Sequence, residues 1–564
     1  MWMAELPPFV PFFIGALLVA LTRGYVRQAI LLLTPLAGGL HLLGVEPGIQ
    51  WQLTFLDYTL TPYRVDRLSL LFGYLFHIGA FLGIVFALQV RDTLQHVTGL
   101  LYAGSALGAV FAGDLVTLFV FWELLVITSV FLIWARRAER SLRTGFRYML
   151  IQVFSGVLLL AGVLIRYYDT GSLAFEYVGL DGLASWLIFL AFGIKCAFPL
   201  LHNWLTDAYP EATPTGTVFL SAFTTKVAVY ALARAFPGTE LLIYIGATMT
   251  VFPIFYAVIE NDLRRVLAYS MINQLGFMVT GIGIGTALAV NGAIAHAFNE
   301  VLFKGLLFMS MGAVLHMTGR INGSELGGLY KSMPITTGLC IVGASSISAF
   351  PLFSGFVSKS MVMAAVLEEG YLWTWLALLF ASAGVFHHAG IKVPFFAFFA
   401  HDSGIRVKEP PLNMLIAMAI AAALNIFIGT YPWPLYGLLP FTIDYLPYDA
   451  THVIAQFQLL FFAALAFAWL KLSGLYPPEL PSVNLDAEWA YRRLGPRIVG
   501  GLWAFFRPID RKLRRASIRR VHAVFATLQR HHGPHGVLAR GWPTGSMVLW
   551  VALLLGMYLV LYYL

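Results

Sequence analysis

Three ionisable residues recur every four positions inside one apolar stretch that runs from about Thr286 to Met317: His296, Glu300 and Lys304. At 3.6 residues per turn, this spacing places all three side chains on one face of a helix. Each such group costs roughly 2.5–3.5 kcal/mol to place in hydrocarbon, so a functional reason is expected. Histidine titrates near pH 6.5 when unperturbed, which suits proton transfer. Two metal ligands without a clear third argue against zinc. The triplet therefore favours a proton relay.

Four more ionisable residues lie within apolar segments: Glu123, Lys195, Lys226 and Lys359. One long lysine near a helix end can extend its ammonium group to the interface, but these three lysines each lie several residues inside their segments. Burial favours the neutral form of a lysine, and a nearby carboxylate favours the charged form. A lysine that is alternately paired with and separated from Glu123 would therefore bind and release a proton.

Other chemistry has little support in the sequence. No GxGxxG after a strand, no Walker A motif and no CxxC pair occurs, so we expect no flavin, nucleotide, iron–sulfur or metal cofactor and no bond chemistry within this chain. The two cysteines, Cys196 and Cys340, lie far apart in apolar surroundings, which predicts buried thiols. We expect His387, His388 and the histidines of 531–535 to be solvated residues near membrane boundaries.

The composition is that of a polytopic membrane protein. The 564 residues are 59% hydrophobic and 11% charged, with a mean hydropathy of +0.78, whereas soluble domains carry about 25% charged residues. About sixteen apolar segments are long enough to cross a bilayer at ~20 residues per crossing. The predicted fold is therefore an all-α polytopic membrane protein of about sixteen transmembrane helices.

Basic and acidic residues alternate between successive loops. The odd loops hold most of the basic residues, among them Arg23, Arg27, Arg91, Arg136, Arg137, Arg140, Arg143, Arg147, Arg264, Arg265, Arg320, Lys331, Arg406 and Lys408. The even loops are acidic. Because basic loops stay in the cytoplasm, both termini are predicted to be extracytoplasmic, in a bacterial plasma (inner) membrane.

Five regions follow from composition and patterning. Residues 46–66 alternate polar and apolar side chains and predict an extracytoplasmic β-hairpin. From Asn484 to Arg540 there are twelve Arg or Lys residues, which predicts a basic amphipathic helix on the cytoplasmic face. Anionic lipid is its favoured partner, a neighbouring subunit is the alternative, and nucleic acid is improbable so close to a bilayer. The expected regions are 1–66 (N-terminal helices and hairpin), 67–432 (core), 433–474 (additional helix region), 475–540 (basic segment) and 541–564 (last helix).

Prolines interrupt two of the apolar segments, Pro199 in FGIKCAFPLLHNW and Pro351 in SAFPLFSGFVSKS. Proline frees backbone groups, which a span tolerates only against protein or a water-filled cavity. The two breaks fall about five helices apart. They predict two inverted five-helix repeats, each with a proline-broken helix and a functional site at the break.

The motifs resemble one family over roughly residues 65–430. DLVTLFVFWELL, FGIKCAFPLLHNWLTDAYPEATPTG, RRVLAYSMINQLGFM, HAFNEVLFKGLLFM and SAFPLFSGFVSKSMV occur in the order found in the antiporter-like subunits of respiratory complex I and of multisubunit (Mrp-type) Na+/H+ antiporters. The longer chain, with a basic insert before a last span, looks most like the D-type subunits of the Mrp antiporters.

The resemblance implies a role for each buried charge. Glu123 and Lys195 would form the modulating pair of an uptake half-channel, and Lys359 would be the exit residue. Lys226, His296 and Lys304 would carry protons along a central axis. His202 and Asp207 match the HxWLxDA loop, where the aspartate would cap the broken helix or line the cytoplasmic entrance. Glu300 replaces a histidine of some relatives; it could act on Lys304 or offer a cation oxygen ligands.

Three functions are compatible with these features. The first choice is the proton-translocating subunit of a multisubunit antiporter, with other membrane subunits as partners and sodium as the coupled ion. The second is the proton-driven membrane subunit of an inorganic-carbon uptake complex, whose large soluble partner would hold zinc. The third is a proton-pumping subunit of a complex I-like NADH:quinone oxidoreductase or membrane hydrogenase, which would bring iron–sulfur clusters.

Overall fold

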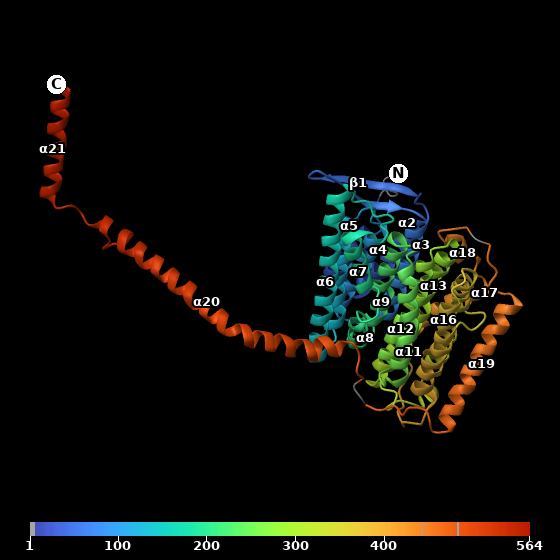
Figure 1. The fold of residues 1–564 in the computed structure, drawn as a ribbon. Helices are drawn as coiled ribbons and strands as arrows, with labels where there is room; N and C mark the ends of the chain where they lie inside the picture. Colours follow the sequence, from blue (N-terminus) through green and yellow to red (C-terminus); the bar gives the residue numbers. More distant parts are fainter. Residues whose placement is uncertain (1–5, 443, 482–483) are drawn as a thin grey trace. The chain divides into compact units, whose positions relative to one another are not determined.

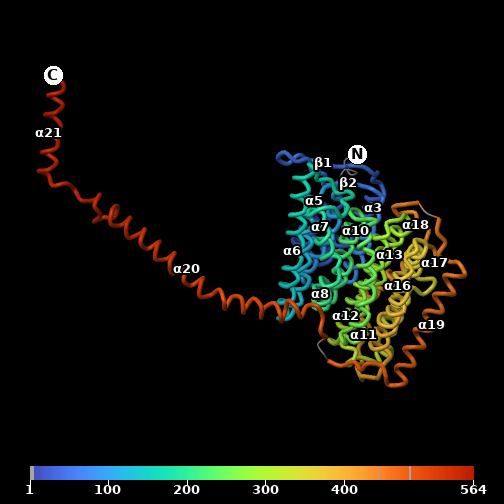
Figure 2. The backbone as a smooth tube through the Cα atoms, viewed as in Figure 1, coloured from blue at the N-terminus to red at the C-terminus, as the bar shows by residue number. Residues whose placement is uncertain are grey.

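A computed structural model describes residues 6–442, 444–481 and 484–564, and the chain is mostly helical, at 75%. It divides into two compact units (Figures 1 and 2). The first unit extends to Asp486, and the second is Ala487–Leu564. Each unit is described by itself.

The first unit is a bundle of helices with one small sheet. Its first half contains α1 (Val10–Leu21), α2 (Gly24–Leu42), β1 (Gly48–Phe55), β2 (Tyr58–Val65), α3 (Arg67–Ala87), α4 (Thr93–Phe111), α5 (Leu115–Trp134), α6 (Glu139–Thr170), α7 (Gly182–Lys195), α8 (Asn203–Ala208), α9 (Gly216–Ala222) and α10 (Thr224–Ala235). Its second half contains α11 (Glu240–Ile259), α12 (Leu263–Ile284), α13 (Ala287–Thr318), α14 (Pro334–Ile347), α15 (Ser354–Glu368), α16 (Leu372–Val385), α17 (Leu412–Thr430), α18 (Trp433–Leu438) and α19 (Ala450–Leu472). Two π-helical segments, Phe386–Lys392 and Phe395–Phe399, continue from α16.

Many of these helices suit a bilayer. Within the described residues, eleven helices are long and apolar enough to cross a membrane, and three shorter apolar helices accompany them. The protein is therefore a polytopic membrane protein, as its composition predicts. The count of sixteen crossings stays a prediction.

The predicted hairpin is confirmed and marks one end of the bundle. Strands β1 and β2 pair antiparallel. The backbone N–H of Thr61 in β2 donates to the Asp114 carboxylate (2.7 Å), which also accepts from Thr117 N–H in the first turn of α5. The N-terminus of α5 therefore lies at this end, which we call the hairpin end.

Both predicted helix breaks are confirmed. Helix α7 ends at Lys195 and α14 ends at Ile347, and Pro199 and Pro351 lie in the loops that follow. Both loops contain the sequence Ala-Phe-Pro-Leu, and the alanine and leucine of each have left-handed backbone conformations: Ala197 (φ 61°), Leu200 (φ 69°), Ala349 (φ 57°) and Leu352 (φ 75°). Such φ values are uncommon outside glycine, so the shared sequence forms the same unusual turn twice.

Other features of the two halves also correspond. An isolated antiparallel bridge joins Asp114, before α5, to Ala174, after α6. A second joins Asp262, before α12, to Asn322, after α13, at the same interval along the chain. Helices α6 and α13 both have 32 residues, and α7 and α14 both have 14. The order of long helix, bridge, short helix and Ala-Phe-Pro-Leu break therefore occurs twice.

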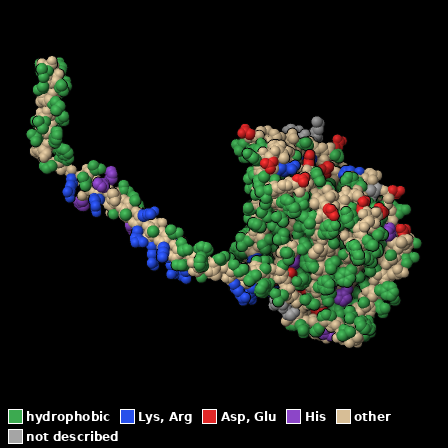
Figure 3. All heavy atoms as spheres, viewed as in Figure 1, with side chains coloured by type: hydrophobic (Ala, Val, Ile, Leu, Met, Phe, Trp, Pro, Cys, Tyr) green, Lys and Arg blue, Asp and Glu red, His purple; other side chains and the backbone are tan. Residues whose placement is uncertain are grey.

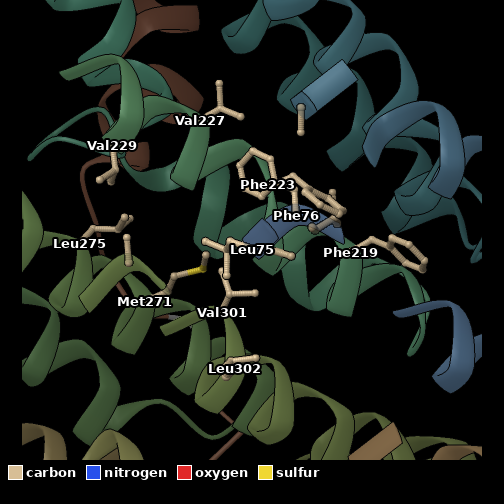
Figure 4. Packing of buried hydrophobic residues seen from close by; sticks show 14 of the residues in the cluster. Leu75, Phe76, Phe219, Phe223, Val227, Val229, Met271, Leu275, Val301 and Leu302 are labelled. Carbon is tan, nitrogen blue, oxygen red and sulfur yellow. The ribbon is translucent and has the colours of Figure 1, made fainter. Parts of the chain in front are cut away.

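Apolar side chains from several helices fill the centre of the bundle (Figure 4). Leu75 of α3, Val227 of α10, Met271 of α12 and Val301 of α13 belong to one buried cluster. This packing surrounds the charged residues described below.

The second unit consists mainly of two helices. Helix α20 (Gly495–His532) covers the basic segment predicted to be helical, and Lys and Arg side chains lie along it (Figure 3). Helix α21 (Thr544–Tyr563) is apolar and long enough to cross a membrane, as predicted for the last segment.

Candidate functional site

The centre of the site is an ion pair between Lys226 and Glu300. Lys226 comes from α10 and Glu300 from the middle of α13, and neither side chain is exposed. The Lys226 ammonium group also donates to the Ser221 carbonyl (3.1 Å), where α9 ends before α10 begins. Glu300 therefore contacts Lys226, a pairing that the regular spacing along α13 did not indicate.

His296 and Lys304 lie one turn of α13 on either side of Glu300. One ring nitrogen of His296 lies 3.1 Å from the side-chain oxygen of Gln274 in α12, and the other lies 3.0 Å from the hydroxyl of Ser358 in α15. Lys304 donates to the Ser270 hydroxyl in α12 (2.8 Å). The predicted triplet thus lies on one side of α13, where it faces three neighbouring helices.

Lys195 and Glu123 approach each other from α7 and α5. The buried Lys195 ammonium group donates to the carbonyl of Trp122 (2.9 Å), the residue before Glu123, and lies 4.8 Å from the centre of the Trp122 ring. The two charges interact, but among the described residues no ion pair within 4 Å joins them. Glu123 Oε1 is buried without a hydrogen-bond partner and points at Gly156 of α6, where an added Cβ would lie 1.5 Å away. Gly156 therefore provides the space that this carboxylate occupies.

Lys359 lies in α15 beside the second break. Its ammonium group donates to the carbonyl of Ile347 (3.1 Å), the last residue of α14, and lies 5.1 Å from the centre of the Phe277 ring. Lys195, beside the first break, is held in the same manner, by one carbonyl group and one aromatic ring. These contacts stabilise an ammonium group where no carboxylate adjoins it.

Electrostatic interactions link these residues into a series. His296 interacts with the charges of Lys226, Lys304 and Lys359. Cys196, directly after Lys195, lies within electrostatic range of Lys226. The seven predicted relay residues therefore lie along the interior of one bundle. Among the described residues, no group of three or more His, Cys, Asp and Glu side chains could hold a metal ion.

His202 and Asp207 lie after the first break. Asp207 in α8 accepts two hydrogen bonds from Arg147 of α6, at 2.7 and 3.0 Å. A ring nitrogen of His202 lies 3.1 Å from Asp486, which also accepts from the Tyr269 hydroxyl (2.7 Å). Both predicted residues therefore join the broken helix to other elements at the end opposite the hairpin.

Comparison with known proteins identifies the family. Residues 112–397 match the family described as the transmembrane domain of NADH:quinone oxidoreductases and Mrp antiporters. The chain belongs to this family. All seven residues predicted to form the relay lie inside the matched range, and the resemblance deduced from the motifs is confirmed.

Individual relatives are similar over much of their length. The chain is 32% identical over 452 residues to the A component of the Na(+)/H(+) antiporter of Alkalihalophilus pseudofirmus, covering 71% of this chain but only 55% of that protein. It is 32% identical over 399 residues to the N component of the NADH-quinone oxidoreductase of Desulforudis audaxviator, covering 65% of this chain and 79% of that protein. A chain of the membrane-bound sulfane sulfur reductase, an archaeal respiratory membrane complex, superimposes with a TM-score of 0.71 at 23% identity, covering 99% of this chain and 100% of that one, which shows a shared fold.

Two buried residues of this antiporter-family bundle differ from the sequence-based expectations. Lys392 is not identified from the sequence, and His388 is expected to be solvated. Lys392 donates to the carbonyls of Val258 (2.6 Å) and Glu260 (2.7 Å) at the end of α11 and pairs with Glu479 (2.9 Å). It therefore caps a helix C-terminus, where a cation is favourable. His388 is fully buried, so its predicted solvation is wrong. A π-helical segment turns both residues inward, which hydropathy does not reveal.

The position of Arg264 also differs from the prediction, which places it in a cytoplasmic loop. It lies in the first turn of α12 and is only 1% exposed. Its guanidinium group donates to the carbonyls of Pro210 and Ala212, both at 3.0 Å. Arginine has five donors in a planar fork, so one side chain can fix this whole turn beyond the first break.

Removing one member of the central pair should destabilise the protein more than removing both. Glu300→Gln would leave Lys226 buried without its carboxylate, and we expect a loss of about 3–5 kcal/mol. Lys226→Met should cost a similar amount, whereas the double variant should cost less than either single variant. Thermal unfolding of the purified protein in mild detergent measures these changes.

Glu139→Gln is the matched control, since its pair with Arg143 is exposed and should contribute at most about 1 kcal/mol. Additive effects of the two central substitutions would contradict a direct Lys226–Glu300 interaction.

Proposed function

We propose that this chain is the proton-translocating subunit of a multisubunit Na+/H+ antiporter, with other membrane subunits as partners. The observation that carries the proposal is the series of ionisable side chains from the half-buried Glu123 and the buried Lys195 to the buried Lys359, with the Lys226–Glu300 pair at its centre. Burying so many ionisable groups is costly unless they serve transport. The similarity to an antiporter component that covers 71% of this chain supports the same class of function.

The geometry suggests how a proton could move along this series. Lys195 binds a proton when Glu123 approaches it and releases the proton when the carboxylate withdraws towards Gly156. The change in charge at Lys195 alters the proton affinity of Lys226. That affinity also depends on the contact between Lys226 and Glu300. Lys304 and His296 then carry the proton towards Lys359, with the Ser270, Gln274 and Ser358 side chains orienting them. Ordered water between these groups completes the proposed path.

Two inverted five-helix repeats and sixteen crossings form part of this proposal. The duplicated bridge, helix lengths and Ala-Phe-Pro-Leu turn support the repeat. The eleven candidate spans become sixteen when α1, α2, α4, α7 and the broken pair α14–α15 are counted as crossings. The cytoplasmic side would then be the end opposite the hairpin, since Arg136, Arg140 and Arg147 contact the 207–211 turn there. Both termini would be extracytoplasmic, in a bacterial inner membrane.

The regions expected from the sequence each have a proposed role. We assign 67–432 to the proton-translocating core, 433–474 to an additional helix region and 541–564 to a final membrane anchor. In the basic segment 475–540, helix α20 would lie on the cytoplasmic face against anionic lipid or a neighbouring subunit. Its mixed apolar and basic side chains suit either surface.

A second candidate is the proton-pumping subunit of a complex I-like oxidoreductase. The similarity to the N component of an NADH-quinone oxidoreductase, which covers 79% of that protein, favours it specifically. Purification of the tagged chain in mild detergent from its own host separates the candidates. Small membrane subunits without metal would support the antiporter. Iron–sulfur clusters in the purified complex would favour the redox pump, and a zinc-containing soluble partner would favour inorganic-carbon uptake.

Lys195→Ala and Lys359→Ala should each reduce cation-driven proton flux to background in vesicles that contain the native complex. Each substitution removes the lysine that carries the proton at its break in the proposed path. Lys331→Ala is the control, because that lysine is 45% exposed and pairs with Asp402 outside the path. Flux at the wild-type rate in either break variant, with the complex intact, would contradict the proposal.

Gly156→Ala should slow proton flux without preventing assembly. The added methyl group would occupy the position of Glu123 Oε1 and so displace the carboxylate relative to Lys195. Gly305→Ala on α13 is the matched control, since an added Cβ there meets nothing within 4 Å. Equal flux in the two glycine variants would argue against a role for the position of Glu123.

A further inference from the structure

Helix α19 lies outside the family match, yet it and the segment before it contact the second break. Gln456 donates to the carbonyl of Ser348 (3.0 Å), and the Leu352 backbone N–H donates to the Tyr448 hydroxyl (3.1 Å). The Phe457 ring packs edge-on against Phe350, with 5.3 Å between the ring centres. These three contacts all involve the turn that positions Lys359. Residues 445–457 therefore form one wall of the second break.

A cavity separates this wall from Lys359. It has a volume of about 190 Å³ and lies between α15, α16 and α19. Lys359, Ser360, His452 and Gln456 supply polar groups to its lining, among apolar residues. A site needs roughly 10–15 Å³ of such volume and two to four polar partners to hold one water molecule. The cavity therefore has room for several water molecules, and its polar side chains can bind some of them.

His452 and Asp449 stand at the beginning of α19, beside the cavity. Their side chains are 31% and 50% exposed, and His452 Nδ1 lies 3.2 Å from an Asp449 carboxylate oxygen. The His452 backbone N–H donates to Asp449 (2.8 Å), and this bond lowers the pKa of the carboxyl group. An imidazole beside an ionised carboxylate can accept a proton from the cavity and pass it to bulk water.

Neighbouring contacts place this segment near the hairpin end. Arg67, just after β2, donates to the Gly437 carbonyl (2.9 Å). Asn291, in the first turns of α13, donates to the Phe441 carbonyl (2.7 Å). The chain therefore runs from the hairpin end through residues 444–449 to the cavity. Among the described residues, Tyr445 and Glu368 are further titratable groups close to Asp449.

We propose that this cavity is the release passage of Lys359, a water-filled path to the hairpin side that is lined by Gln456 and ends at His452 and Asp449. This inference rests on the proposed function and adds the exit route to it. Lys359 transfers its proton through water to the imidazole of His452, Asp449 stabilises the resulting imidazolium, and the imidazolium then loses the proton to bulk water. Gln456 positions the second break and orients water; it does not titrate.

Cysteine labelling of the native complex in oriented vesicles tests the passage. Ala455 and its neighbour Ile454 are both exposed on α19, but only Ala455 lines the cavity. Ala455→Cys should react with a membrane-impermeant cationic thiosulfonate, added from the hairpin side, about tenfold faster than Ile454→Cys, because only a hydrated thiol ionises readily. The native Cys196 and Cys340 are buried and provide a low background.

The passage is overturned if Ala455→Cys reacts only with an apolar maleimide, since the cavity would then hold lipid. Reaction from the opposite side alone would also contradict it. Labelling of Ala455→Cys should in addition block proton flux, and His452→Asn should slow it. Flux that survives Lys359→Ala while the cysteine is still labelled by the polar reagent would refute the proposed function but leave the water-filled cavity in place.

Discussion

The ion pair between Lys226 and Glu300 is the interaction on which the rest of the bundle depends. Neither side chain reaches solvent, and a buried charge that loses its partner destabilises a protein strongly. Helices α10 and α13 must therefore remain in contact at this point. Val227 and Val301, which adjoin the two charged residues along the chain, pack in a cluster of apolar side chains (Figure 4), and the exclusion of water there strengthens the attraction. The pair thus fixes the centre of the bundle, which the proposed proton path crosses.

The other lysines are stabilised by weaker groups. Lys195 and Lys359 each have one carbonyl acceptor and one aromatic ring, and Lys304 has the Ser270 hydroxyl. These groups stabilise an ammonium ion where it has no carboxylate in direct contact. The second break supplies the acceptor for Lys359, because α14 ends at Ile347, whereas Lys195 donates to Trp122 within α5. The Ala-Phe-Pro-Leu turn of the second break is therefore linked directly to the environment of Lys359.

Several features of the fold and the site could be predicted from the sequence. Hydropathy indicates the membrane helices, the strand pattern indicates the hairpin, and proline with polar neighbours indicates both breaks. The regular spacing of His296, Glu300 and Lys304 predicts their shared helix face. All of these are local properties of the chain. The confirmed family resemblance depends on the same local motifs.

The remaining features depend on contacts between distant segments. The spacing along α13 does not indicate that Glu300 pairs with Lys226 of α10. Lys392 and His388 turn inward because the helix changes to π geometry, which has no hydropathy signal. Arg264 is buried because the 209–213 turn offers it several carbonyls. Helices α2 and α4 and the broken helices are too polar or too short to be counted reliably as crossings.

The most direct test of the account is proton flux in vesicles that contain the native complex with Glu300→Gln or Glu300→Asp. Glutamine keeps the size of the side chain but removes the charge, whereas aspartate keeps the charge on a shorter side chain. The account predicts that the Gln variant loses flux while the assembled complex persists, and that the Asp variant retains part of it. Wild-type flux in the Gln variant would contradict a proton path through the Lys226–Glu300 pair.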